Sequence, residues 1–147
     1  MWENTASTVA IDTSVVATRD YIMSRLNDDQ VMLVDARTPE EYTGTKRLST
    51  RSGHIPGAVN LNWLDTIDAN NHLRLKPRRI LKDMLEARRI LPTREIITYC
   101  QTHHRSAHTW ILLKSLDYPA VRGYPGSWSE WGNDPETPIQ MLSETNP

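Results

Sequence analysis

Hydrophobic residues along the chain follow two alternating patterns. Short runs rich in apolar or β-branched residues occur at four places, residues 31–34, 58–61, 96–99 and 120–122. Runs of this length between polar turns are typical of parallel strands that are covered on both faces. Apolar residues at helical spacing lie between them, at 80–87 and 106–116. The alternation predicts an α/β fold with a central, mostly parallel sheet of about five strands and helices on both faces.

The N-terminal part carries weaker signals. Val9–Ile11 and Val15–Val16 can each form a short edge strand, which would supply the fifth strand. Thr18 is a good N-cap with an acidic residue following it, so we expect a helix over residues 19–26. The side chains expected to be buried by this helix are Ile22, Met23 and Leu26.

The middle of the chain contains two polar segments. Thr38 followed by Pro39 has the N-cap and N1 pattern of a helix start, directly after the first strand. Residues 44–52 are polar and basic and are expected to be a loop, in which Arg51 is either solvated or helps to attract an anion. Residues 70–77 are expected to be a linker.

Length and charge narrow the class of protein. The 147 residues fit one domain, so we expect 1–147 to be a single domain with a loose lead-in at 1–8 and a polar tail at 133–147. The polar lead-in also suggests one half of a tandem protein. The chain has 17 Lys and Arg and 18 Asp and Glu, so its net charge does not favour binding to nucleic acid or to a membrane surface. No apolar run is long enough to cross a bilayer, and we expect no signal peptide. A single cysteine excludes an internal disulfide and favours a reducing cytoplasm.

One helix face is strongly basic. The polar face of the helix around residues 80–87 carries five cations, Arg78, Arg79, Lys82, Arg88 and Arg89. Such a face can bind nucleic acid or an acidic partner. Because no aromatic residues are interleaved with the cations and two acidic residues interrupt them, a solvated face is the preferred interpretation.

The candidate chemistry lies between the strand at 96–99 and the following helix. Cys100 comes at the carboxyl end of this strand, where open α/β sheets bind ligands. Unpaired N–H groups at a helix start and the cation of Arg105 would stabilise a thiolate, which can act as a nucleophile. A buried structural cysteine is the plainer alternative. Zinc is another, because Cys100 lies near His103, His104 and His108 in sequence.

Four motifs resemble those of the rhodanese-type sulfurtransferase family. They are Val34–Tyr42, Ser52–Ala58, the loop Cys100–Arg105, and Gly123–Trp128. The resemblance implies a catalytic Cys100 and no metal or organic cofactor. It places substrate-binding groups at Gln101, Thr102, His103, His104 and Arg105. It also implies a supporting polar cluster of Asp35, Arg37 and Glu41, in which Arg37 and Glu41 pair.

The implied reaction is sulfur transfer between small molecules. Cys100 would take the outer sulfur of a donor such as thiosulfate as a persulfide, and an acceptor such as cyanide or a thiol would remove it. The backbone N–H groups of residues 101–105 would surround the persulfide. This chemistry requires the Cys100 sulfur to be reachable from solvent. A phosphatase is less favoured, because cysteine phosphatases place the arginine six residues after the cysteine and Arg105 comes one residue earlier.

The active loop also departs from the family pattern. Gln101 stands where thiosulfate-using members often have a basic residue, and His103 stands at a glycine position. We expect His103 to adopt a left-handed backbone conformation. A protonated histidine in the loop would attract thiosulfate, so we expect activity to fall as the histidines lose their protons, and a His104→Ala variant tests this for His104. Two other functions stay open, a persulfide relay to a protein partner or partner domain, and a non-catalytic binding module.

Overall fold

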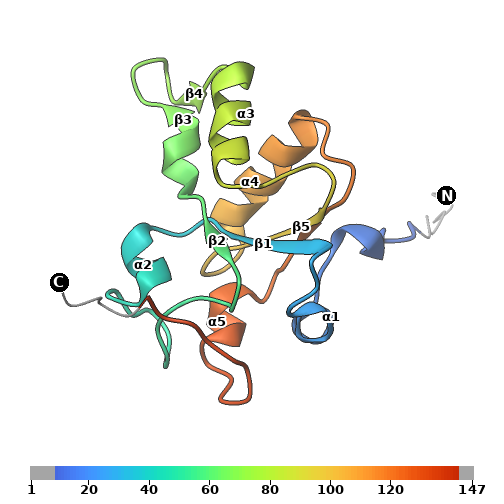
Figure 1. Cartoon of the computed structure of the whole chain (residues 1–147), viewed down its shortest axis with the longest axis vertical. Helices are drawn as coiled ribbons and strands as arrows, with labels where there is room; N and C mark the ends of the chain where they lie inside the picture. The colour runs from blue at the N-terminus through green and yellow to red at the C-terminus, as the bar shows by residue number, and fades with distance from the viewer. Residues whose placement is uncertain (1–8, 143–147) are drawn as a thin grey trace, which may run out of the picture.

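The computed structural model describes residues 9–142. Its regular elements alternate as the sequence predicts (Figure 1). The helices are α1 (Arg19–Arg25), α2 (Pro39–Thr43), α3 (Arg78–Ala87), α4 (His104–Ser115) and α5 (Ser127–Trp131), with 3-10 helices at Thr13–Val15 and Trp63–Thr66. The strands are β1 (Val31–Asp35), β2 (Val59–Asn60), β3 (Ile67–Asp68), β4 (Arg74–Leu75), β5 (Glu95–Tyr99) and β6 (Val121–Gly123).

The central sheet has four parallel strands in the order β2-β1-β5-β6. Helices α3 and α4 cover one face and α1 and α5 cover the other (Figure 1). Each face buries its own cluster, centred on Leu85 and Leu112 beneath α3 and α4 and on Trp128 and Trp131 beneath α5. Because β1 and β5 are neighbours, their carboxyl ends place Asp35 and Tyr99 opposite each other. The predicted α/β fold is confirmed, with helices on both faces.

The predicted fifth strand is reduced to one bridge. Val16 pairs in parallel with Gly123 at the sheet edge, whereas Val9–Ile11 forms no regular element and is exposed. Thr18 caps α1 as predicted, with its hydroxyl accepting from the N–H of Tyr21. The expectation that Met23 is buried is wrong, since this side chain is exposed. The helix is short and only one of its stripes reaches the sheet.

Two segments expected to be irregular are more ordered than predicted. Within the expected linker, β4 pairs antiparallel with β3 as a small hairpin. Part of the expected polar tail, residues 133–142, packs on the domain through the buried Thr137 and the backbone pairing of Gln140 with His54. The expected lead-in at 1–8 and the end of the tail lie outside the described residues.

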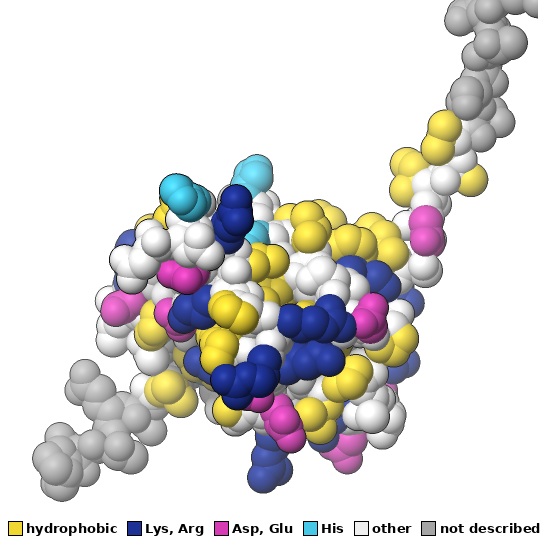
Figure 2. Space-filling view, turned by 90° about the horizontal axis from the view of Figure 1, so that it is seen from above, with side chains coloured by type: hydrophobic (Ala, Val, Ile, Leu, Met, Phe, Trp, Pro, Cys, Tyr) yellow, Lys and Arg dark blue, Asp and Glu magenta, His cyan; other side chains and the backbone are white. Residues whose placement is uncertain are grey.

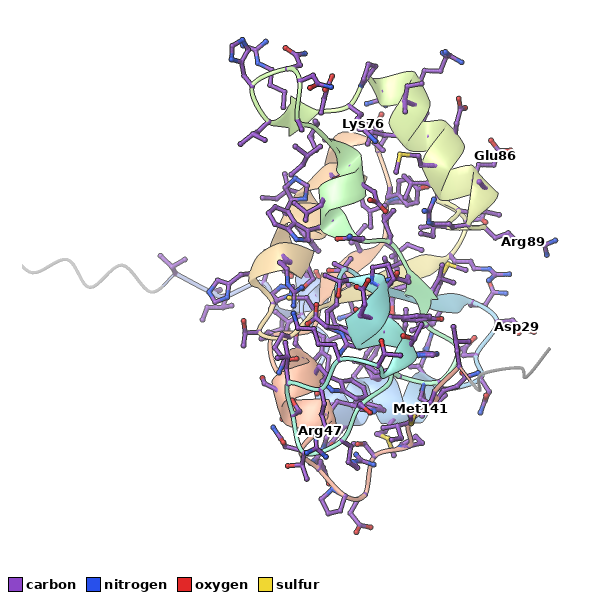
Figure 3. The ribbon with its side chains drawn as sticks, turned by 90° about the vertical axis from the view of Figure 1, so that its left-hand side faces the viewer. Asp29, Arg47, Lys76, Glu86, Arg89 and Met141 are labelled. Atoms are coloured by element: carbon purple, nitrogen blue, oxygen red, sulfur yellow. The ribbon has the colours of Figure 1, made fainter. Side chains whose placement is uncertain are left out.

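The loop that follows α2 is anchored by Arg51. Its guanidinium donates to the carbonyls of Trp131, Asp134 and Thr137, so neither predicted role for Arg51, in solvent or at the site, is correct. By contrast, Arg47 in the same loop is exposed (Figure 3). Arg51 therefore attaches this loop to the chain that follows α5.

The basic face of α3 points to solvent. Lys and Arg side chains gather over the end of the molecule that carries α3, with acidic residues among them (Figure 2). Arg79 is 3.5 Å from Asp83, and Arg78 is 2.6 Å from Asp117. Both pairs are exposed, so they neutralise part of the charge and contribute little to stability. That this face is simply solvated stays a prediction.

Candidate active site

Cys100 lies at the carboxyl end of β5, directly before the turn into α4. Helix α4 begins at His104, two residues earlier than predicted. Among residues 9–142, no side chain caps this helix start, so the N–H groups of its first turn have no side-chain acceptor there. The structure thus brings the thiol, an uncapped helix N-terminus and Arg105 together at one edge of the sheet. In Figure 3 helices α2, α4 and α5 meet around this edge.

The backbone of the loop is held from one side by α5. The N–H groups of Trp128 and Ser129 donate to the carbonyls of Cys100 and Gln101, both at 2.9 Å. In a trans peptide the C=O and N–H point in opposite directions. The N–H groups of Gln101 and Thr102 therefore point away from α5. These two main-chain donors have no hydrogen-bond acceptor within residues 9–142 and lie on the other side of the loop.

The loop histidines face different surroundings. His103 has the left-handed conformation predicted for it, with φ of 68°. Its Nδ1 lies 2.6 Å from the hydroxyl of Ser106, and its ring packs on Gly123, where a Cβ would collide with it. Burial, and to a lesser extent the nearby His104, lowers the pKa of His103. His103 is therefore placed to shape the loop as a neutral side chain, whereas His104 is exposed beside Thr102, with Nδ1 3.0 Å from its hydroxyl.

Arg105 forms a two-pronged ion pair with Glu41 of α2. Its two terminal nitrogens lie 2.7 and 2.9 Å from the Glu41 carboxylate oxygens. The pKa of Arg105 is raised, chiefly by the hydrogen bond with Glu41 and to a smaller extent by the nearby Cys100. The predicted pairing of Arg37 with Glu41 is wrong. Glu41 instead joins α2 to the active loop, a long-range contact that the local motif does not reveal.

The carboxylate of Glu41 is 2% exposed and strongly stabilised in its charged form. Burial alone would raise the pKa of Glu41, but the hydrogen bonds from Arg105 and from the Thr38 N–H outweigh it and lower the pKa to about 2. The Thr38 hydroxyl in turn accepts from the Glu41 N–H, which completes a capping box at the start of α2. Helix formation and loop closure thus use the same carboxylate.

Acid titration should expose this coupling. Because the folded-state pKa of Glu41 lies below its ordinary value of 4.5, Glu41 stabilises the protein above that value, and this contribution is lost as the pH falls toward 2. We expect it to amount to about 3 kcal/mol in the free energy of unfolding, since one pH unit corresponds to about 1.4 kcal/mol. Denaturant unfolding measured across this range should show a shallower acid decline in Glu41→Gln. An equally steep decline in that variant would contradict the assignment.

Asp35 and Arg37 form a buried pair behind the loop. Arg37 donates to both Asp35 oxygens, the shortest contact being 2.6 Å, and to the carbonyl of Gly53. Its guanidinium also lies 4.6 Å from the ring of Trp128. Within the described part of the chain, neither residue forms a hydrogen bond or ion pair with Cys100. Their place is to join β1 to the 53–58 turn and to support α5, which in turn holds the loop.

The structure bears on two points that the sequence raised about Cys100, its access to solvent and the zinc alternative. The side chain was expected to be reachable from solvent, but the residue is 1% exposed. In the loop that follows the cysteine, Thr102 and His104 are exposed and Arg105 is partly exposed. Among residues 9–142, no three His, Cys, Asp or Glu side chains lie close enough together to hold a metal ion. The geometry therefore does not support the zinc alternative, since His103 turns toward Ser106 and away from any shared centre.

Sequence reasoning missed three serines that support the loop. Ser49 accepts a hydrogen bond from the Gln101 side-chain amide at 3.0 Å. Ser106 contacts His103, and Ser127 accepts the N–H of Cys100 at 3.2 Å. Ser127 lies inside the Gly123–Trp128 motif, so the motif marked its importance but gave no partner.

Comparison with known proteins agrees with this geometry. The model of the rhodanese-like domain family matches residues 18–134, which cover every residue placed at the site. The chain therefore belongs to the rhodanese-like domain family. No helix among residues 9–142 combines the length and apolarity that a membrane span needs.

Curated relatives are similar over most of this chain. A thiosulfate sulfurtransferase from Pseudomonas aeruginosa is 49% identical over 125 residues, which cover 85% of this chain and 45% of that protein. The sulfur carrier protein TtuD from Thermus thermophilus is 35% identical over 145 residues, covering 90% of this chain and 50% of that protein. The chain thus spans about half the length of these relatives.

Solved structures show the same fold. An anaerobic ergothioneine biosynthesis enzyme from Chlorobium limicola superimposes with a TM-score of 0.79 at 24% sequence identity. The match covers 87% of this chain and 32% of that one. The architecture around β5 and α4 is therefore that of an established fold.

Proposed function

We propose that this chain is a sulfurtransferase domain that moves a sulfane sulfur from a donor such as thiosulfate to cyanide or a thiol through a persulfide on Cys100. The observation that carries the proposal is the position of the sole cysteine, between β5 and an uncapped helix start and beside Arg105. The relatives named thiosulfate sulfurtransferase support it, at 41–49% identity.

The first half-reaction forms the persulfide. The Cys100 thiolate attacks the outer sulfur of thiosulfate, a new S–S bond forms, and the original S–S bond breaks with its electron pair leaving on sulfite. The N–H groups of Gln101 and Thr102 and the guanidinium of Arg105 stabilise the negative charge. Glu41 holds the Arg105 guanidinium at the end of the loop, while Asp35 and Arg37 support the loop from behind.

The second half-reaction returns the thiolate. Cyanide attacks the outer sulfur, thiocyanate leaves, and the S–S electron pair stays on Cys100. No metal or organic cofactor takes part. Because Cys100 is buried, each substrate enters as the exposed Thr102 and His104 move aside, while Arg105 stays paired with Glu41.

Steady-state kinetics test the proposal. Thiocyanate formation from thiosulfate and cyanide should give parallel lines in double-reciprocal plots, as expected for two half-reactions that share a covalent intermediate. Intersecting lines would favour a ternary complex and contradict the persulfide route. An aryl phosphate assay serves as the parallel test of phosphatase activity, and we expect no turnover because the loop is one residue shorter than the phosphatase pattern.

A persulfide relay is the second candidate, favoured by the similarity to the sulfur carrier protein TtuD. The chemistry at Cys100 is the same, but the acceptor is the thiol of a protein partner or a partner domain. A protein thiol that removes sulfur much faster than cyanide does would identify the relay. A non-catalytic module is less consistent with the retained cysteine and closing arginine. The single cysteine suits a reducing compartment, which we propose to be the cytoplasm, and neither candidate calls for nucleic acid or a membrane.

A further inference from the structure

Ser127 has a backbone conformation that serine rarely adopts. It begins α5 with φ of 50°, in the left-handed region that favours glycine, and it is fully buried. Gly126 directly before it has an ordinary right-handed conformation. A strained serine at a site where glycine would fit without strain indicates that the hydroxyl is needed there.

Both hydrogen-bonding roles of the Ser127 hydroxyl are in use. The oxygen accepts the N–H of Cys100 at 3.2 Å, and the hydroxyl donates to the carbonyl of Tyr124 at 2.9 Å. The next residue, Trp128, donates its N–H to the carbonyl of Cys100. Two successive residues of α5 therefore hold the N–H and the C=O of the cysteine residue itself.

These contacts determine where the loop donors point. The carbonyl of Cys100 is held against α5, and the N–H of Gln101 in the same peptide plane must then point away from it. Without the Ser127 hydroxyl, the buried Cys100 N–H would lose its acceptor. This N–H belongs to the peptide that precedes Cys100, whose carbonyl accepts from the N–H of Ala36. The Ser127 hydroxyl and the Trp128 N–H thus fix the two peptides on either side of Cys100, and loss of the first contact would free the Cys100 torsions that set the direction of the loop donors.

We propose that Ser127 is a positioning residue for Cys100, whose hydroxyl fixes the loop so that the Gln101 and Thr102 N–H groups face the sulfur. This inference rests on the proposed function in one respect: the Gln101 and Thr102 N–H groups are taken to stabilise the negative charge on sulfur. The strained backbone is retained because the hydroxyl must approach the Cys100 N–H from this position.

Two variants separate positioning from simple stabilisation. Ser127→Ala removes the hydroxyl and keeps the backbone strain, whereas Ser127→Gly removes the hydroxyl and relieves the strain. We expect Ser127→Gly to melt at a higher temperature than Ser127→Ala. If the hydroxyl positions the cysteine, the reactivity of Cys100 toward iodoacetamide should nevertheless fall equally in both variants. A hydroxyl control is Ser115→Ala at the far end of α4, where the hydroxyl donates to the Leu112 carbonyl within the same helix.

The readout is the reaction of the single cysteine with iodoacetamide across a range of pH. With weaker donation to the thiolate, the rate at low pH should fall by about tenfold and the midpoint of the profile should move to higher pH in both variants. The charged and titratable groups around the loop are the same in all proteins compared: Asp35 and Arg37 behind it, Glu41 of α2, His103, and His104 and Arg105 of α4.

The outcomes distinguish this inference from the proposed function. Equal shifts in both variants, with Ser115→Ala like the parent, support positioning. An unchanged pH profile of alkylation in folded Ser127→Gly overturns the inference. A shift of that profile in Ser127→Ala alone, the variant with the lower melting temperature, also overturns it. Sulfur uptake from thiosulfate is measured separately, so a parent protein that takes up no sulfur refutes the function without altering the alkylation result.

Discussion

Replacing Cys100 with serine is expected to abolish thiocyanate formation from thiosulfate and cyanide. A hydroxyl is a far weaker nucleophile than a thiolate for sulfane sulfur, and loss of a covalent nucleophile costs about 10⁴-fold or more in turnover. Cys100 is the only cysteine in the chain, so no neighbouring thiol can replace it. The measurement is the initial rate of thiocyanate formation at saturating thiosulfate.

The control for this variant is its stability. Serine is close in size to cysteine, and the backbone contacts of residue 100 with Ser127 and Trp128 do not involve its side chain. We therefore expect Cys100→Ser to unfold cooperatively within a few degrees of the parent. A folded variant that kept more than about a tenth of the activity would contradict covalent catalysis at this residue.

Neutralising Asp35 is expected to give the largest loss of stability. Asp35 is fully buried and is the main partner of Arg37, which is itself 1% exposed. In Asp35→Asn the arginine charge remains buried without a compensating anion, and removal of one member of such a pair costs about 3–5 kcal/mol. Urea unfolding should show this as a lower midpoint with a similar slope.

An exposed ion pair provides the matched comparison. Asp83 lies 3.5 Å from Arg79 on α3, and both side chains are more than half exposed. Asp83→Asn should change the free energy of unfolding by less than about 1 kcal/mol. If Asp35→Asn were equally mild, the buried pair would not be what joins β1 to the 53–58 turn.

Local patterns predicted most of the fold. The apolar runs at β1 and β5 and the caps at Thr18 and Thr38 depend on residues close in sequence, and the structure shows each of them. The fifth strand was overestimated because β-branched residues near the N-terminus have only a sheet edge to pair with, and a single bridge forms there. The β3–β4 hairpin was missed because its two-residue strands show no period.

The site was predicted in composition but not in its contacts. The family resemblance named Cys100, the loop to Arg105 and the polar cluster, but it paired Arg37 with Glu41. The partner of Glu41 lies 64 residues away, and the partner of Cys100 on α5 lies 27 residues away. Contacts of this range depend on how helices pack on the sheet, which periodicity does not specify. The burial of Cys100 follows from the same packing.

The central claim is that Cys100 can carry a sulfur atom. The most direct measurement is the intact mass of the protein after incubation with thiosulfate and removal of excess reagent. We predict a gain of one sulfur atom per chain, located on Cys100 by peptide mapping and lost on addition of cyanide. An unchanged mass in folded protein whose Cys100 still reacts with iodoacetamide would contradict the account.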